Sequence, residues 1–323
     1  MILYRIGFSQ LYFDSLPSLS NQTVRRRSTI QRGEIIDMKK FIPLAILAIL
    51  IVPAYVVAAR SDTGSGPKPS IVLVHGAWAD GSSWSGVIQR LQEQGYTVYA
   101  PANPLRGLTS DSAYIAGFLQ TISGPIILVG HSYGGAVITN AATGNTNVKA
   151  LVYIDAFAPD QGESLASLSS TPPPAGQSPS CVSGNPAQVF NFVPLTGRDV
   201  DLYIKPSLFP SCFANDLPPK EGAVLASTQR PIALSAFSQQ SGVPAWKTIR
   251  SFYLVGTIDN AIPPFAQLFM AQRANATIVE VRGSHLVMIS HPEAVVDLIN
   301  QAAHPMSDSS NANSGLTFAL TSL

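Results

Sequence analysis

Charged side chains are scarce in this chain of 323 residues. Only 12% of the residues are Asp, Glu, Lys or Arg, about half of the usual share in a soluble domain. The 20 basic residues nearly balance the 19 acidic ones, whereas a nucleic-acid-binding protein gathers positive charge on one face. The composition therefore argues against a nucleic acid as partner, and a surface of uncharged polar residues suits an extracellular protein.

Cysteine is nearly absent too, since Cys181 and Cys212 are the only two in the chain. Two cysteines without histidines at ligand spacing are too few for a zinc site, and we expect no bound metal. In an oxidising compartment such a pair favours one disulfide. If the chain is not exported, two buried free thiols are the better interpretation.

One uncharged run near the N-terminus, at residues 41–59, directly follows Lys39-Lys40. A basic start, an apolar stretch and the small residues Val57-Ala58-Ala59 are typical of a cleaved secretory signal peptide, here over residues 38–59. We therefore expect a secreted or periplasmic protein that leaves the membrane after cleavage. An uncleaved anchor is the alternative, because the run approaches the ~20 residues that span a bilayer.

The two ends of the chain are expected to lie outside the folded domain. Residues 1–37 precede the signal, although a signal peptide normally begins at or near the true N-terminus. We interpret them as an extension that is not part of the native protein, with Met38 as the true start, and a genuine cytoplasmic extension is the alternative. The tail at residues 302–323 is rich in Ser and Asn, and we expect it to be flexible.

From Ser70 onward, short β-rich runs alternate with amphipathic stretches, which is typical of βαβ units and a mainly parallel sheet. The expected strands cover residues 71–74, 97–100, 126–129, 150–154, 252–255 and 277–281. The expected helices cover residues 84–93, 110–122, 136–142 and 292–301. For the second of these helices, Ser110 or Asp111 is the expected N-cap. The sequence thus predicts one α/β domain over residues 60–301, with helices flanking a central sheet.

The regular alternation stops between residues 158 and 245, where prolines are frequent. Proline removes a backbone donor, so we expect the sheet not to continue through this segment. An insertion of this length is too long for a simple loop. We therefore predict a cap over the functional site, with one helix at residues 221–229 and with both cysteines inside it.

The pentapeptide GHSYG at residues 130–134 matches the pattern G-x-S-x-G and lies between an expected buried strand and an expected helix. In that context a sharp turn exposes the serine hydroxyl, and glycines are required where the backbone turns tightly. The N-terminus of the following helix favours negative charge on a substrate. The motif therefore predicts Ser132 as a nucleophile.

A serine hydroxyl needs a base, and the chain has five histidines. His285 follows the last expected strand, which places it at the carboxyl edge of the sheet beside the motif, and we predict it as the base. His291 is the second candidate, although the proline after it marks the start of a helix. His75 is expected to brace the turn after the first strand, and His131 to point away from the serine.

The third catalytic group is a carboxylate that holds the histidine in the right tautomer. Asp155 directly follows one expected strand, Asp259 lies just past another, and both precede His285 in the chain. We predict Asp259, because it lies in a Gly-Thr turn close in sequence to His285, and keep Asp155 as the alternative acid or a pocket residue. The alternative to a catalytic role is that Asp259 only caps its own turn.

An oxyanion hole requires two backbone donors, and we predict the N–H groups of Ala77 and Tyr133. Trp78 and Trp84 lie near this loop in sequence. Each is expected either to line the substrate pocket or to pack in the core.

Several motifs together resemble bacterial α/β-hydrolases related to the plant methylesterase and hydroxynitrile lyase group. The quoted segments are HGAWADGSSW at residues 75–84, LVYIDAFAP at 151–159, GTID at 256–259 and Ser284-His285, together with the G-x-S-x-G pentapeptide. The resemblance covers about residues 69–301. It implies the α/β-hydrolase fold, carboxylesterase-like activity, Ala77 and Tyr133 as oxyanion donors, and no cofactor.

The expected activity is hydrolysis of a small ester, lactone or related carboxylic derivative through an acyl-enzyme on Ser132. The alternatives are a lyase or cofactor-free haloperoxidase-like activity with the same triad, or a small-molecule receptor without turnover. The plant lyases that the chain resembles carry a lysine directly after the catalytic histidine, where this chain has Leu286. That difference disfavours cyanohydrin chemistry.

Overall fold

The computed structural model describes residues 68–304. The predicted upstream extension, the signal peptide at residues 38–59 and nearly all of the predicted tail lie outside the described residues. The central sheet has six strands in the order β2-β1-β3-β4-β8-β9, and every neighbouring pair is parallel. Its strands are β1 (Ser70–Val74), β2 (Val98–Tyr99), β3 (Ile126–His131), β4 (Val148–Ile154), β8 (Ser251–Gly256) and β9 (Thr277–Val281). The predicted mainly parallel sheet is confirmed.

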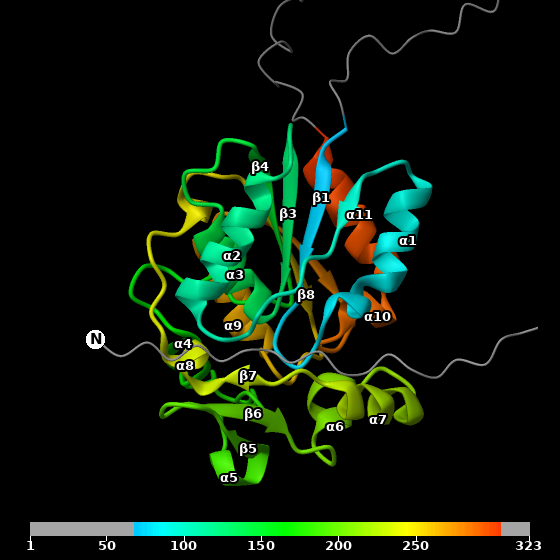
Figure 1. The fold of residues 1–323 in the computed structure, drawn as a ribbon. Helices are drawn as coiled ribbons and strands as arrows, with labels where there is room; N and C mark the ends of the chain where they lie inside the picture. The colour runs from blue at the N-terminus through cyan, green and yellow to red at the C-terminus, as the bar shows by residue number, and fades with distance from the viewer. Residues whose placement is uncertain (1–67, 305–323) are drawn as a thin grey trace, which may run out of the picture. The chain divides into compact units, whose positions relative to one another are not determined.

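Strand β3 lies at the centre of this sheet because it has no polar face. All six of its residues are buried, as expected for a strand that is covered by helices on both sides. Figure 1 shows α2 and α3 on one face, and α1 and α11 on the other. The main helices are α1 (Ser85–Glu93), α2 (Leu108–Gln120), α3 (Tyr133–Ala141), α9 (Pro264–Arg273) and α11 (Pro292–Ala303), with the short α10 (Val287–Ser290) before the last.

Helix α2 differs from the sequence prediction at its start. It begins at Leu108 with Gly107 as N-cap, so neither Ser110 nor Asp111 caps it. The Asp111 carboxylate instead reaches back to accept the N–H groups of Arg106 and Gly107 at 3.0 and 3.2 Å. The N-cap prediction was therefore wrong, because a carboxylate in the first turn can satisfy backbone donors that precede the helix without being its N-cap.

The segment between β4 and β8 forms a second, antiparallel sheet in the order β5-β6-β7, which the proline content did not predict. Its centre, β6 (Val200–Ile204), contains no proline, while the edge strand β5 (Phe190–Pro194) ends in one. Edge strands and strand ends tolerate proline, because no ladder hydrogen bond is lost there. The third strand of this sheet is β7 (Ile232–Ala233), and the α-helices of the segment are α4 (Leu165–Ser169), α5 (Pro186–Val189), α6 (Phe209–Phe213), α7 (Pro219–Thr228) and α8 (Leu234–Ser238).

We call this segment the cap, and Figure 1 shows its small sheet and its helices together at one end of the central sheet. That end receives the carboxyl termini of β3, β4 and β8, where ligands bind in open parallel sheets. The predicted disulfide between Cys181 and Cys212 is present, with Cα atoms 5.8 Å apart. It joins the chain ahead of α5 to α6. Within residues 68–304, no helix is long and apolar enough to cross a membrane.

Candidate active site

Ser132 lies in the tight turn between β3 and α3. Its backbone has φ 53° and ψ −124°, a strained conformation for a residue with a side chain. The turn needs the flanking glycines, because a Cβ at Gly134 would lie 2.3 Å from the carbonyl oxygen of Val74, and one at Gly130 would lie 2.6 Å from that of Gly134. These contacts are the physical reason for the spacing of the G-x-S-x-G motif.

The structure brings Ser132, His285 and Asp259 into one hydrogen-bonded chain. His285 Nε2 is 2.9 Å from Ser132 Oγ, and His285 Nδ1 is 2.8 Å from Asp259 Oδ2. All three side chains are buried, so water competes little for these bonds. In this geometry the serine hydroxyl donates to the imidazole while the imidazole donates to the carboxylate, as general-base activation of a serine requires.

Asp259 is held by four donors. Its Oδ1 accepts the N–H groups of Ala261 and Ile262 at 2.7 and 3.0 Å. Its Oδ2 accepts Gln267 Nε2 at 2.8 Å in addition to His285 Nδ1. Asp259 therefore caps its own turn and also orients the histidine. The sequence analysis missed Gln267, since a glutamine on α9 carries no motif that marks it.

Asp155, the alternative acid, ends β4 in a different environment. Its Oδ1 accepts the N–H of Gly256 at 2.5 Å, and its Oδ2 is buried without a partner within residues 68–304. Burial, reinforced by the negative charge of Asp259, raises the pKa of Asp155 well above its usual range. The carboxyl group thus favours its protonated form. It does not line the pocket at Ser132, contrary to one of the sequence predictions.

Two other histidines support the site without bonding the serine. His75 Nδ1 donates to the carbonyl of Gly76, and its Nε2 accepts the N–H of Asn103, both at 2.9 Å. Burial lowers the pKa of His75 to about 4, so this histidine stays neutral and braces the turn after β1. His131 Nε2 bonds the carbonyl oxygen of His285 at 2.8 Å and so supports the loop of the proposed base.

His291, the second candidate for the base, lies at the start of α11, away from the serine. Its Nε2 is 3.9 Å from Asp216 Oδ2, and its side chain is about one third exposed. The neighbouring Ser284 donates its backbone N–H to the same Asp216 at 2.9 Å and also bonds it through its hydroxyl. His291 and Asp216 therefore help to hold the loop that carries His285.

Two backbone donors lie beside Ser132. A Cβ at Gly76 would lie 2.6 Å from Ser132 Cβ, so the turn after β1 packs directly on the serine and brings Ala77 next to it. Tyr133 is the first residue of α3, and first-turn N–H groups have no partner within the helix. Ala77 and Tyr133 line one pocket with Ser132 and His285. Such a pair of donors can stabilise an oxyanion.

The remaining wall of this pocket is apolar and comes largely from the cap. It consists of Trp78, Phe157, Leu165, Val182, Phe213, Phe237, Ala261 and Ile262. Trp78 thus lines the pocket, whereas Trp84 is buried in the core with its ring edge-on to His131 at 6.2 Å, so core packing is the one of its two expected roles that the structure shows. The sequence analysis did not identify Phe213 or Phe237, because isolated aromatics in an irregular segment carry no positional signal.

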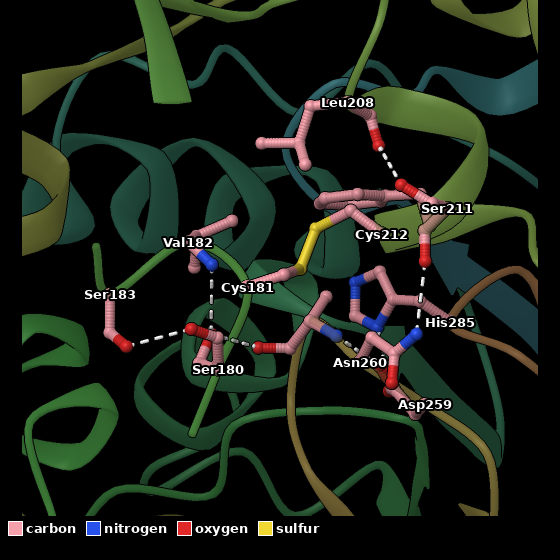
Figure 2. Close-up of a disulfide and its surroundings, with 12 residues drawn as sticks. Ser180, Cys181, Val182, Ser183, Leu208, Ser211, Cys212, Asp259, Asn260 and His285 are labelled. Carbon is pink, nitrogen blue, oxygen red and sulfur yellow. Dashed lines mark hydrogen bonds and ion pairs between the residues drawn. A yellow bond between two sulfur atoms is a disulfide. The ribbon is translucent and has the colours of Figure 1, made fainter. Parts of the chain in front are cut away.

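The disulfide lies close to this pocket (Figure 2). The N–H of Cys181 donates to the carbonyl of Asn260 at 2.8 Å, next to Asp259. On the other side, Cys212 precedes Phe213, whose ring lies 4.8 Å from that of His285. The disulfide therefore connects a cap segment that bonds the residue after Asp259 to a second cap segment that packs on His285.

The model of the Alpha/beta hydrolase family matches residues 71–298. This match covers more than half of the chain, and the chain belongs to the alpha/beta hydrolase family. The fold and the resemblance inferred from the motifs are thereby confirmed. No group of three or more His, Cys, Asp or Glu residues that could hold a metal ion occurs within residues 68–304.

The chain is 35% identical over 112 residues to a carbendazim hydrolyzing esterase of Nocardioides sp. (strain SG-4G), a match that covers 31% of this chain and 46% of the esterase. It is 27% identical to the chloroplastic methylesterase 13 of Arabidopsis thaliana, over 69% of this chain and 54% of that protein. The matches thus span about half of the length of these two relatives. An extracellular alpha/beta-hydrolase from a Paenibacillus species superimposes with a TM-score of 0.60 at 22% identity, covering 73% of this chain and 100% of the other, and shows the shared fold.

Proposed function

We propose that the protein is a serine esterase that hydrolyses carboxylic esters through an acyl-enzyme on Ser132. The observation that carries the proposal is the continuous hydrogen-bonded chain from Ser132 Oγ through His285 to Asp259, with distances of 2.9 and 2.8 Å. Relatives named as an esterase and a methylesterase support ester bonds as the target.

In the first half of the reaction, Ser132 Oγ attacks the carbonyl carbon while His285 Nε2 takes its proton. The carbonyl oxygen becomes an oxyanion that accepts the N–H groups of Ala77 and Tyr133. Collapse of this intermediate breaks the bond to the alcohol oxygen, and the imidazolium returns the proton to the departing alcohol. Asp259 stabilises the imidazolium throughout without taking its proton.

In the second half, a water molecule takes the place of the alcohol beside His285. The imidazole removes a proton from the water as its oxygen attacks the acyl carbon, and the same two donors stabilise the second oxyanion. Collapse returns the proton to Ser132 Oγ and releases the carboxylic acid. No cofactor is needed, because the protein itself supplies nucleophile, base and oxyanion donors.

The proposal is tested with p-nitrophenyl acetate in a stopped-flow instrument, together with intact-protein mass spectrometry. We expect a burst of p-nitrophenol of about one equivalent per enzyme if deacylation is the slower step, and a mass increase of one acetyl group on the quenched enzyme. Ser132→Ala removes both signals. Turnover that survives Ser132→Ala would contradict the proposal, and release of aldehyde from a cyanohydrin would instead identify a lyase.

We further propose that the enzyme is exported after cleavage of a signal peptide at residues 38–59. The disulfide between Cys181 and Cys212 supports an oxidising compartment, and an extracellular hydrolase shares the fold. N-terminal sequencing of exported protein is expected to begin near Arg60. Recovery of peptides from residues 1–37 in the mature protein would contradict this proposal.

A further inference from the structure

The cap contains an apolar groove next to the pocket at Ser132. Its volume is about 260 Å³, much larger than the pocket itself, which has about 10 Å³. The smaller volume holds about one water molecule. An ester larger than the smallest ones therefore needs space beyond the pocket. A second neighbouring cavity, which shares Phe157, Ala261 and Ile262 with the pocket, has only about 40 Å³, so the groove offers the larger adjoining space.

The groove lies between α4, β5, β6 and α8 and is lined mainly by apolar side chains. Those used below are Ala166, Val182, Phe190 and Phe237. Phe192, also in its wall, is 45% exposed, and Leu234 is 46% exposed. Large apolar side chains that stay open to water around a concave surface are typical of a ligand-binding site.

Two side chains separate the groove from the pocket. Val182 and Phe237 line both cavities, so the partition is one side chain thick. Both are only partly buried, and partly exposed side chains change rotamer without disturbing the packed core. Rotation of Phe237 or Val182 would join the two cavities into one.

The wall of the groove packs against the residue that follows an oxyanion donor. Trp78 directly follows the oxyanion donor Ala77, and its ring lies 5.8 Å from those of Phe190 and Phe237 in the groove wall. The carbonyl oxygen that occupies the oxyanion hole belongs to the acyl group. The leaving alcohol must lie at His285 Nε2, which has to protonate it. This arrangement directs the acyl chain, rather than the alcohol, toward the groove.

We propose that the groove is an acyl-binding site for extended apolar acyl chains, and that Val182 and Phe237 admit the chain from the pocket. This inference rests on the proposed esterase function. The preferred substrates are then esters of medium-chain or longer carboxylic acids. Each methylene that enters the groove raises kcat/KM by up to about fourfold, because burial of one CH₂ corresponds to that factor in an equilibrium.

The test measures kcat/KM for p-nitrophenyl acetate, butanoate, octanoate and dodecanoate. Ala166→Trp fills the groove from α4, where Ala166 is exposed and lines it. The matched control is Ala223→Trp on α7, an exposed alanine of the cap that lies outside the groove lining. We expect Ala166→Trp to lower the ratio of octanoate to acetate kcat/KM at least tenfold, and Ala223→Trp to keep the wild-type ratio.

Phe237→Ala gives a second, independent readout, because it removes part of the partition and should raise the dodecanoate to acetate ratio. The groove assignment is overturned if kcat/KM of the wild type does not depend on acyl length, or if the two tryptophan variants have equal ratios of octanoate to acetate kcat/KM. In either case, acetate turnover that depends on Ser132 would still support the esterase function. If Ala166→Trp instead lowers the ratio of octyl acetate to ethyl acetate, the groove binds the alcohol and the acyl assignment is wrong. Absence of Ser132-dependent hydrolysis of any ester overturns both proposals.

Discussion

Gln267 donates from Nε2 to the Oδ2 atom of Asp259 over 2.8 Å, and the same oxygen accepts the Nδ1 proton of His285. The same amide nitrogen also donates to the carbonyl of Ile262 at 2.7 Å. Gln267 thereby holds the same carboxylate oxygen that meets the imidazole. Such an outer contact is a positioning interaction, since it acts on the nucleophile only through two other side chains.

Gln267→Leu tests this positioning role. We expect kcat for p-nitrophenyl butanoate to fall by about tenfold, the effect of losing one hydrogen bond of ~1.4 kcal/mol in the transition state. The matched control is Gln272→Leu, which alters an exposed glutamine on the same helix and should leave kcat within twofold. Equal kinetics for the two variants would show that Gln267 has no part in orienting Asp259.

The substitutions Asp259→Asn and Asp155→Asn test which of the two carboxylates orients His285. Asn at position 259 favours the wrong imidazole tautomer, so we expect a loss of about 10⁴ in kcat, as in the serine-protease precedent. The melting temperature should change little. Asp155→Asn should keep kcat within about tenfold, because Asp155 bonds Gly256 rather than His285. A severe loss in Asp155→Asn with an active Asp259→Asn would reverse the assignment.

The raised pKa of Asp155 also predicts how stability depends on pH. A carboxyl group whose pKa is higher in the folded state contributes fully to stability below its unfolded pKa of about 3.9, and this contribution is lost as pH rises toward the folded value. Asn cannot ionise, so Asp155→Asn should melt near the wild-type temperature at pH 4 and above it at pH 8. Melting curves across this range check the trend, and a difference that is independent of pH would contradict it.

Gly134 is expected to be irreplaceable, because its Cα lies against β1. The Cβ of Gly134→Ala would overlap the carbonyl oxygen of Val74 at 2.3 Å, and neither β1 nor α3 can move without disturbing the core. We expect insoluble protein or loss of cooperative unfolding in circular dichroism. Gly117→Ala in α2 is the control, since its Cβ meets nothing within 4 Å and should stabilise the helix by roughly 0.5–1 kcal/mol. Similar melting of both variants would refute the steric argument.

The disulfide is expected to stabilise the cap. Its cysteines are 31 residues apart, for which the chain-entropy model gives about 3–4 kcal/mol. Reduction, or Cys181→Ser with Cys212→Ser, should therefore lower the melting temperature by roughly 6–16 °C. Because Cys181 bonds Asn260 beside Asp259, kcat should fall as well. Free thiols that titrate in the native oxidised protein would contradict the pairing.

Local chemistry in the sequence determined the central architecture and indicated the candidate nucleophile. Alternating apolar strands and amphipathic helices predicted the parallel sheet, since these periodicities reflect which face of each element is buried. The pentapeptide at residues 130–134 identified Ser132, because a tight strand-to-helix turn requires glycine at fixed spacing. The prediction of His285 as the base followed from its position after the last expected strand, because the carboxyl ends of parallel strands meet at one edge of the sheet.

Tertiary structure alone decided what depends on contacts between distant segments. Local sequence context favoured Asp259 over Asp155, but the contacts of the two carboxylates come only from the folded structure, which places Asp259 against His285 and buries Asp155 against Gly256. The sequence did not predict the small cap sheet or the places of Phe213 and Phe237 in the pocket wall, and it left open whether Trp84 packs in the core or lines the pocket. Each depends on side chains from segments far apart in the chain, and no local periodicity or turn preference encodes which of them meet.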